Sequence, residues 1–484
     1  MALSIEDIAV FCKKKGFVYP GSEIYGGLAG FWDFGPLGVE LFNNIKADWW
    51  RYFVQSRENM VGIDASIISH PRIWKASGHI ESFSDISIQC KSCKKINKID
   101  KVDIGKVKCE FCGGELDTNT AKELKLLFPL SVGSNGITAY LRGETAQGMF
   151  TDFKIIADTA RKKVPFGICQ IGKCFRNEIA PRDFLFRSRE FTIGEFEFFI
   201  HPDEKKCNIL DKKHLDTEIM FLDSETQEKG KTDLKKTKIG KMVKDKRLGE
   251  WHAYWLAEQA LWFKSLGLDM NKIKIREHVK SELSHYSSAT FDIDYNYPFG
   301  SKEVAGNANR GQYDLNQHIK ESKERLELFD EETKKKIIPR VIEPTFGMER
   351  VFLAVLVDAY NYDKERGNIV LKLNPKLAPV KVGVFSLVNK LNNQTRKVYN
   401  LLKENFVCQF DTAGSVGRRY ARADEIGIPF CITFDFDSLK DKAATIRDRD
   451  TTKQIRVKIS DLVDVLRKLI NSEIKLEKAG KLVK

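Results

Sequence analysis

The sequence predicts an α+β protein in two parts: a large domain that contains an antiparallel hairpin and a small cysteine-rich insertion, and a smaller C-terminal α/β domain. Three observations lead to this prediction. Apolar and polar residues alternate in two stretches within 166–200, two C-x-x-C pairs lie within 90–112, and strand and helix patterns alternate after residue 380. A chain of 484 residues, 42% of them hydrophobic, is also too long for one compact core.

Helical patterns begin the large domain. Residues 4–16 have the spacing of a short amphipathic helix, and the stretch 21–38 is rich in glycine and aromatic residues, as expected of a loop. Between Val39 and Val54, apolar residues recur at helical spacing and form a broad apolar side. Such a helix either enters the core or forms a subunit interface.

The rest of the large domain mixes strands and helices. The patterns predict strands at 63–68 and 291–297 and helices at 145–160, 251–266 and 348–360. The segment 203–250 is rich in lysine and poor in apolar residues, which predicts an exposed insertion that either contacts RNA phosphates or is simply solvated. A proline-punctuated link at 374–379 marks the expected boundary between domains 1–375 and 380–484.

The C-terminal domain follows a different pattern. Predicted strands at 380–385, 407–410 and 430–434 alternate with predicted helices at 394–405, 416–426 and 459–475. Alternation of this kind is typical of an α/β unit with a mixed or parallel sheet.

Charge and cysteine content narrow the class of protein. The formal net charge of +13 and the pI near 9.0 suggest a polyanionic partner, although a basic protein without such a partner has the same charge. The chain has no apolar run of membrane-spanning length, and its start lacks the order of a signal peptide, so we expect a cytoplasmic protein without a membrane partner. Cytosolic thiols stay reduced, so grouped cysteines there indicate a metal site or chemistry.

Four cysteines have the spacing of a metal site. Cys90 and Cys93 form one C-x-x-C pair, and Cys109 and Cys112 form the second. Two such knuckles can close a tetrahedral zinc site, here within a ribbon expected at 88–118. Because four protein ligands leave no open position, the zinc would be structural.

The hairpin region combines arginines with acidic residues. Arg176 ends the first predicted strand, the following loop holds Arg187 and Arg189, and Glu195 lies on the return strand. Guanidinium groups bind phosphate oxygens in pairs, and carboxylates bind an ammonium group or a magnesium ion, although cross-strand salt bridges would give the same pattern. A second passage, 343–350, places Arg350 one turn into a helix that opens at a glycine, where it can face a bound triphosphate.

These passages resemble the three motifs of class II aminoacyl-tRNA synthetases. The helix entered through Gly-Pro-Leu-Gly at 35–38 resembles motif 1, FRNE at 175–178 with FRSREF at 186–191 resembles motif 2, and FGMER at 346–350 resembles motif 3. The chain also lacks the G-x-x-x-x-G-K-[ST] loop of other ATP-using proteins. The resemblance implies a catalytic domain built on an antiparallel sheet and, through motif 1, a homodimer.

Within this class the amino-acid sequence is similar to that of the glycyl-tRNA synthetase family. The passages that carry the similarity are YPGSEIYGGLAGFWDFGPLG at 19–38, RGETAQG at 142–148, ELSHY at 282–286, NRGQYDL at 309–315 and EPT at 343–345. The sequence departs from the family pattern at Gly143, where proline is usual, at Lys302, where tryptophan is usual, and at Asn307.

The resemblance implies roles for individual residues. Arg176 and Arg350 would be the catalytic residues that hold the ATP phosphates. The wider ATP site would comprise Arg176, Asn177, Glu178, Phe186, Arg187, Ser188, Arg189, Glu190, Phe191, Glu282, Leu283, Gly347, Met348, Glu349 and Arg350, with Glu282 as a magnesium or ribose ligand. The glycine site would comprise Glu144, Phe191, Thr192, Ile193, Gly194, Glu195, Glu343, Pro344, Thr345, Phe346 and Gly347, with the three glutamates around the ammonium group.

The implied activity is the ATP-dependent ligation of glycine to tRNA(Gly) through glycyl-adenylate, with Mg²⁺ as a cofactor and zinc as a structural ion. The C-terminal domain resembles the anticodon-binding domain of related synthetases through the passage GRRYARADEIGIPF at 417–430. Arg418, Arg419, Tyr420 and Arg422 would contact unstacked anticodon bases.

Two alternatives remain at this point. One is another synthetase of the same subclass, for proline, threonine, histidine or serine. The other is an inactive paralogue that uses the fold to bind nucleic acid, against which the retention of both Arg176 and Arg350 argues, because buried arginines without a phosphate would be uncompensated charges.

Overall fold

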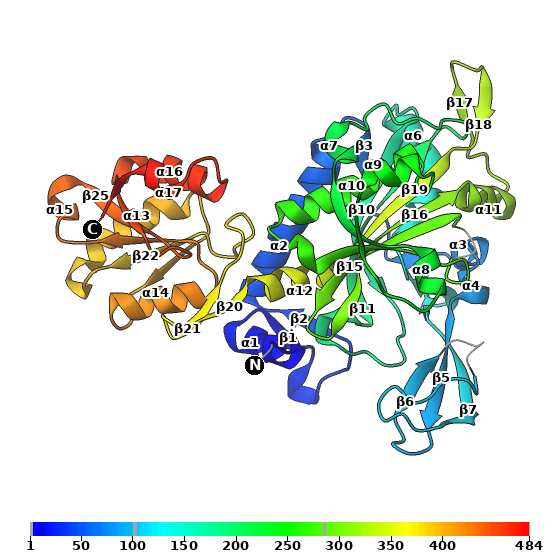
Figure 1. Cartoon of the computed structure of the whole chain (residues 1–484), viewed down its shortest axis with the longest axis horizontal. Helices are drawn as coiled ribbons and strands as arrows, with labels where there is room; N and C mark the ends of the chain where they lie inside the picture. The colour runs from blue at the N-terminus through cyan, green and yellow to red at the C-terminus, as the bar shows by residue number, and fades with distance from the viewer. Residues whose placement is uncertain (1–2, 100–103, 284–286, 484) are drawn as a thin grey trace.

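The computed structural model describes residues 3–99, 104–283 and 287–483 (Figure 1). Its larger part is built on a nine-stranded sheet with the order β13-β12-β14-β15-β16-β19-β11-β10-β3. Neighbouring strands are antiparallel except for the pairs β12–β14 and β10–β3. The strands are β3 (Met60–Gly62), β10 (Phe166–Phe175), β11 (Glu190–Ile200), β12 (Glu218–Leu222), β13 (Lys235–Lys238), β14 (Ile273–Glu277), β15 (Ala289–Tyr297), β16 (Gly300–Gly311) and β19 (Arg340–Gly347). The mainly antiparallel sheet and the hairpin of β10 and β11 confirm the predicted α+β class.

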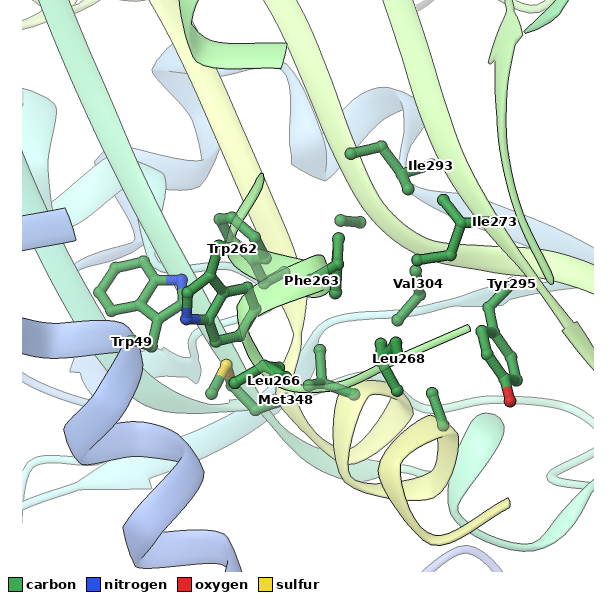
Figure 2. Packing of buried hydrophobic residues seen from close by; sticks show 14 of the residues in the cluster. Trp49, Trp262, Phe263, Leu266, Leu268, Ile273, Ile293, Tyr295, Val304 and Met348 are labelled. Atoms are coloured by element: carbon green, nitrogen blue, oxygen red, sulfur yellow. The ribbon is translucent and has the colours of Figure 1, made fainter. Parts of the chain in front are cut away.

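Three helices pack on one face of this sheet and form the main core. They are α2 (Pro36–Trp50), α10 (Glu250–Ser265) and α12 (Met348–Ala359). Figure 2 shows Trp49 of α2, Trp262 and Phe263 of α10, and Met348 of α12 gathered in this core, and all four are fully buried. The predicted helix at 39–54 therefore enters the core, and it begins earlier, at Pro36, because proline suits the first helical turn.

The opposite face of the sheet carries shorter helices around the site described below. The predicted helix at 145–160 is divided at Asp152 into α5 (Ala146–Thr151) and α6 (Phe153–Thr159), and these pack with α11 (Tyr313–Ser322) on a second buried cluster. The predicted strand at 63–68 is wrong: β3 ends at Gly62 and β4 (Ile68–Ser69) begins only at Ile68.

The lysine-rich segment 203–250 is largely exposed, as expected, but it is built into the large domain. Its strands β12 and β13 extend the edge of the main sheet, and α9 (Ile239–Lys244) buries Ile239 and Met242. Lys236 and Lys238 of the edge strand pair with acidic side chains, at 2.8 Å from Glu218 and 2.9 Å from Asp216. Lysines on an edge strand protect it from pairing with other chains. Because such a strand has few apolar residues, the hydrophobicity pattern did not predict it.

A small ribbon projects from the large domain at the bottom of Figure 1. It is a three-stranded sheet of β5 (Ser84–Cys90), β6 (Ile96–Ile99) and β7 (Leu116–Lys125). Its core is small, with Ile86, Ile88, Ile99 and Leu116 buried beside Cys90 and Cys109. Strands β8 (Phe128–Val132) and β9 (Ile137–Leu141) return the chain to the domain, where β9 pairs with β4.

The C-terminal part is a mixed six-stranded sheet with the order β23-β22-β24-β25-β26-β27. Its strands are β22 (Val382–Ser386), β23 (Cys408–Asp411), β24 (Phe430–Phe434), β25 (Ala443–Asp448), β26 (Gln454–Lys458) and β27 (Lys481–Leu482), and its main helices are α13 (Asn392–Lys403), α14 (Val416–Glu425) and α16 (Leu462–Ile470). The first three strands are parallel and the others antiparallel, as expected of an α/β unit with a mixed sheet, but the sequence patterns missed β25 and β26.

Smaller elements complete the fold. They are α1 (Ile5–Lys15), β1 (Val18–Pro20), β2 (Trp32–Phe34), α3 (Pro71–Ala76), α4 (His79–Ser82), α7 (Lys212–Leu215), α8 (Ser224–Glu228), β17 (Leu328–Asp330), β18 (Lys335–Ile337), β20 (Tyr360–Asp363), β21 (Asn368–Leu371), α15 (Ser438–Asp441) and α17 (Leu476–Ala479). Within the described residues, every helix is too short or too polar to cross a lipid bilayer.

Candidate active site and metal centre

An open cleft with about 640 Å³ of empty space lies where the β10–β11 loop meets the end of β19. It is lined by Arg176, Glu178, Leu185, Phe186, Arg187, Ser188, Phe191, Ile193, Glu303, Thr345, Gly347, Glu349 and Arg350. The structure thus brings together most residues that the sequence assigned to ATP. Leu185 and Glu303 were missed, because neither belongs to the stretches that carry the resemblance.

Arg176 and Arg350 approach the cleft from different elements. Arg176 follows β10; its Nε donates to the carbonyl of Gly143 at 3.0 Å, and its guanidinium lies 5.3 Å from the ring centre of Phe191. Arg350 lies in the first turn of α12, 4.4 Å from the ring centre of Phe186. Two guanidinium groups that lie over aromatic rings, one of them in the first turn of a helix, suit a polyphosphate with an attached base.

The other motif 2 arginines stabilise the loop. Arg187 donates to Glu178 through Nε at 2.8 Å and Nη2 at 2.6 Å, and Arg189 donates to the carbonyls of Glu178 and Ala29 at 3.0 Å each. For Arg187, the alternative of a salt bridge within the hairpin is therefore realised, while its side chain still lines the cleft.

Some predicted ATP residues do not line the cleft. Glu190 forms an ion pair with Lys173 at 3.0 Å, and exposed Glu282 accepts from Arg276 at 2.8 Å. Asn177, Arg189, Leu283 and Met348 are also absent from its lining, and Met348 is buried in the core. Residues 284–286 of the ELSHY passage lie outside the described residues.

A cluster of buried acidic side chains, Glu144, Glu195 and Glu343, adjoins the cleft at Thr345 and is named the acidic pocket. Glu195 accepts from Thr145 Oγ1 at 2.5 Å and from Thr345 Oγ1 at 2.8 Å. Glu343 of the neighbouring strand accepts from Arg310 Nη1 at 2.8 Å. The three predicted glutamates of the glycine site are all buried, so the pocket suits a small cation that can take the place of water.

Buried polar groups balance these acids unequally. Glu144 lies 3.2 Å from His79 Nε2 and accepts from Gln147 at 3.0 Å. Burial alone would raise its pKa, but His79 and then Arg310 outweigh burial and lower the pKa of Glu144. Burial raises the pKa of Glu343 well above its usual range, against the opposing effect of Arg310. Glu144 is thus stabilised as a carboxylate, whereas burial opposes the ionisation of Glu343.

The two-residue period of the strands divides the predicted glycine site. Phe191, Ile193 and Glu195 of β11 face the cleft and pocket, whereas Gly194 faces Trp49 and Met348 in the core. In the same way Thr192 donates to Glu349, at 2.7 Å from its N–H and 2.9 Å from its Oγ1, and Phe346 packs on Trp49, Phe53, Trp262 and Phe263. The assignment of the side chains of Thr192, Gly194, Pro344 and Phe346 to the glycine site is therefore corrected: they alternate away from it.

The pocket also contains residues that the sequence reasoning did not assign. Thr145 and Gln147 lie in the RGETAQG passage, and Arg310 and Asp314 lie in NRGQYDL, so the signal was present in text already quoted. Arg310 Nε and Nη2 donate to the two carboxylate oxygens of Asp314 at 2.7 Å each. The departures Lys302 and Asn307 do not reach the pocket: Lys302 is exposed, and Asn307 donates to Gln259 of α10 in the core.

The four cysteines of the ribbon converge as a metal site requires. Their four Sγ atoms lie within 4.8 Å of one another. The Sγ atoms of Cys90 and Cys112 are 3.6 Å apart, as are those of Cys93 and Cys109. The backbone N–H of Cys93 lowers the pKa of Cys90, and despite burial, backbone N–H groups lower that of Cys109 to about 6. Against the backbone N–H of Lys95, burial and the neighbouring thiols raise the pKa of Cys93 to about 12, so two of the thiols favour the thiolate that binds metal. Four convergent thiols without a disulfide are compatible with a structural zinc ion.

The proposed anticodon residues divide between surface and interior. Arg418 is exposed, and Arg422 is half-exposed while donating to Asp411. Arg419 is buried, and donates to the carbonyls of Ser386, Thr412 and Gly414 at 2.6–2.9 Å. Its assignment to anticodon contact is corrected, because the Arg419 side chain is 2% exposed and its guanidinium donates to these carbonyls of its own domain. Tyr420 is half-buried, and its hydroxyl lies 2.5 Å from Thr433 Oγ1.

Comparisons with known proteins agree with this geometry. Residues 381–469 match the family model of an anticodon binding domain. The chain is similar to a glycine–tRNA ligase of Acetivibrio thermocellus (43% identical, covering 95% of this chain and 97% of that protein) and to one of Bacillus cereus (41% identical, covering 96% and 99%). Among solved structures, it resembles prolyl-tRNA synthetase from Cryptosporidium parvum, crystallised with halofuginone and AMPPNP, with a TM-score of 0.59, 13% identity, and coverage of 97% of this chain and 77% of that one.

The structural likeness shows a class II aminoacyl-tRNA synthetase fold, and the anticodon-binding match lies on its C-terminal sheet. Sequence identity above 40% over nearly the whole length is much higher than proteins need in order to share a fold. The chain therefore belongs to the glycine–tRNA ligase family.

Proposed function

We propose that this protein uses ATP to activate glycine as glycyl-adenylate, releasing pyrophosphate, and then transfers the glycyl group to tRNA(Gly), releasing AMP. The observation that carries this proposal is the acidic pocket beside a cleft that holds Arg176 and Arg350, with Thr345 shared between the two. Glycine offers only its charges and its small size for recognition, so buried carboxylates are the groups suited to bind its ammonium group.

The mechanism follows from positioning and charge. Glu144, Glu195 and Glu343 bind the ammonium, which directs the glycine carboxylate toward the α-phosphate near Arg176. The carboxylate oxygen attacks phosphorus in line, the bond to the pyrophosphate oxygen breaks, and pyrophosphate leaves toward Arg350. In the second step the terminal ribose hydroxyl of the tRNA attacks the activated carbonyl, and AMP leaves. No side-chain nucleophile is required, because the glycine carboxylate and the ribose hydroxyl are the attacking groups. The protein contributes by positioning them and by stabilising the developing negative charge with its arginines.

ATP would lie with its base near Phe191 and Phe186, whose rings face the cleft under the two arginines. Magnesium prefers carboxylate oxygens, and Glu303 and Glu349 line the cleft. Both are engaged, since Glu303 lies 3.2 Å from Arg350 and Glu349 accepts twice from Thr192, so each would bind the ion that accompanies ATP only after releasing its partner. When bound, Mg²⁺ would neutralise phosphate charge. Glu282 would serve as a ligand only after releasing Arg276.

The remaining parts of the proposal concern partners. We propose that Cys90, Cys93, Cys109 and Cys112 bind a structural zinc ion, that residues 380–484 bind the anticodon through Arg418, Tyr420 and Arg422, and that the enzyme is a cytoplasmic homodimer. The dimer rests on the resemblance of the α2 region to motif 1, and Val39 on its outer side is 41% exposed. Light scattering of the purified protein tests the dimer.

Amino-acid-dependent exchange of pyrophosphate into ATP tests the activity. The assay compares glycine with alanine, serine, proline and threonine, without and with tRNA. Exchange with glycine alone supports both the chemistry and the pocket. Exchange with another amino acid would keep the reaction class and reject the pocket assignment, and no exchange with any would favour a nucleic-acid-binding paralogue.

A further inference from the structure

Glu197 is a buried carboxyl group without a partner, two residues along β11 from Glu195. Its side chain has no solvent exposure, and neither of its oxygens receives a hydrogen bond from any described residue. Burial removes the hydration that stabilises a carboxylate, so an ionised group here would need a counter-charge or several donors.

The neighbours of Glu197 do not supply that counter-charge. Glu195 lies on the same face of β11, and the register between β11 and β19 places Glu343 opposite Glu197. One oxygen of each of these three carboxyl groups lies within 4.8 Å of the others. On the other side, the partner of Glu197 in β10 is the apolar Ile168.

The nearby cation is already engaged. Arg310 donates to both oxygens of Asp314 and to Oε1 of Glu343, at 2.7–2.8 Å. Burial, followed by repulsion from Glu343, raises the pKa of Glu197 well above its usual range despite Arg310. Because Arg310 contacts Glu343 directly, the negative charge of the facing pair is better stabilised on Glu343, and the proton on Glu197.

We infer that Glu197 is a neutral carboxylic acid whose O–H donates to the second oxygen of Glu343, and that it thereby positions the Glu343 carboxylate for the substrate ammonium. This inference rests on the proposed function. Arg310 donates to Oε1 of Glu343 at 2.8 Å, but burial and a side-chain contact with Glu195 raise the pKa of Glu343, so its carboxylate needs a further donor to stay ionised. Both oxygens of Glu195, in contrast, already accept from Thr145 and Thr345. Glu197 does not touch glycine and acts through Glu343.

Two substitutions separate a neutral donor from a charged ligand. Glu197→Gln keeps a neutral donor of nearly the same shape, so the KM for glycine in pyrophosphate exchange should stay within about twofold of wild type. Glu197→Leu removes the donor, and the loss of one hydrogen bond to a charged group predicts a KM for glycine raised about tenfold, with the KM for ATP unchanged. Glu343→Gln, which removes the charge itself, is the comparison and should raise the KM for glycine at least about a hundredfold.

Each outcome decides the inference. If Glu197→Gln raises the KM for glycine as much as Glu343→Gln, Glu197 carries a charge and the inference is overturned; an unchanged KM in Glu197→Leu also overturns it. Infrared spectroscopy gives a readout independent of activity: wild type should show the C=O stretch of a protonated carboxyl that Glu197→Gln lacks, and absence of this band in wild type refutes the neutral state. If wild type shows no glycine exchange, the proposed function fails, while the infrared band still reports on Glu197.

Discussion

Replacing Arg310 with methionine should destabilise the large domain by about 3–5 kcal/mol at pH 7, because it leaves buried carboxylates without their counter-charge. The side chain of Arg310 is 1% exposed and that of Asp314 2% exposed. Three hydrogen bonds of 2.7–2.8 Å, to Asp314 and Glu343, are lost together. Methionine fills much of the same space, so the loss measures charge more than volume.

Tryptophan fluorescence in a urea titration measures this loss. All seven tryptophans lie at positions 32–262, in the large domain. The fluorescence change therefore reports the unfolding of the large domain separately from that of the C-terminal domain. The exposed Arg325→Met is a matched control and should change stability by less than about 0.5 kcal/mol. Arg310→Met with Asp314→Leu should recover part of the loss, since one uncompensated charge is removed.

The pH dependence of the same variant has a definite sign. Burial raises the pKa of Glu343 and Arg310 opposes that rise, so the pKa of Glu343 in the folded variant should be higher still. A group whose pKa is raised on folding contributes stability at low pH and loses it as pH rises. The deficit of Arg310→Met should therefore be larger at pH 8 than at pH 6. A deficit below about 1 kcal/mol, or one that grows on acidification, would show that Arg310 does not compensate these buried carboxylates.

Three further predictions concern the other sites. Arg350→Met should lower kcat in pyrophosphate exchange by about 10²–10³, as expected for losing a group that stabilises developing charge; a change confined to protein stability would contradict this. Cys109→Ser should lower the zinc content measured by atomic absorption, whereas the control Cys408→Ser should not; equal content in both would reject the ribbon site. Arg418→Gln should raise the KM for tRNA about tenfold in aminoacylation while leaving pyrophosphate exchange unchanged, whereas Arg419→Gln should lower the melting temperature of the C-terminal domain; the reverse pattern would restore Arg419 as an anticodon contact.

Local patterns predicted the elements whose apolar residues repeat regularly. The β10–β11 hairpin, α10 and β24 lie within a residue or two of their expected ranges. The patterns failed where tertiary contacts determine the secondary structure. Strand β13 consists of lysine and threonine and is held by its pairing with β12. Strand β25 pairs with β24 in a sheet whose strand order the hydropathy pattern does not reveal. Asp152 interrupts a helix that the apolar spacing alone would continue.

The same limit applies to the candidate site. The motifs located Arg176, Arg350 and Glu195 together, because Arg176 follows β10, Arg350 follows β19, and Glu195 lies on β11 between these two strands. They could not separate Arg418, which is exposed, from the buried Arg419 one position later, because that depends on which carbonyls of the folded domain need a donor. A run of arginines in a sequence therefore predicts a basic helix, and only packing decides which of them remain for a ligand.

Glu195 and Glu197 show why charge is harder to predict than position. Strand alternation places both on one face, and nothing in their spacing distinguishes them. Glu195 receives two hydroxyl donors, from Thr145 just before α5 and from Thr345 of β19, which stabilise a carboxylate, whereas Glu197 receives none in the described residues and pairs with Ile168 in the β10–β11 register. If both were ionised beside Glu343, Arg310 would have to balance three acids as well as Asp314. A site that binds a single ammonium group is more stable with one of these acids neutral. Each uncompensated buried charge would cost the empty enzyme more folding free energy than one bound substrate cation could offset.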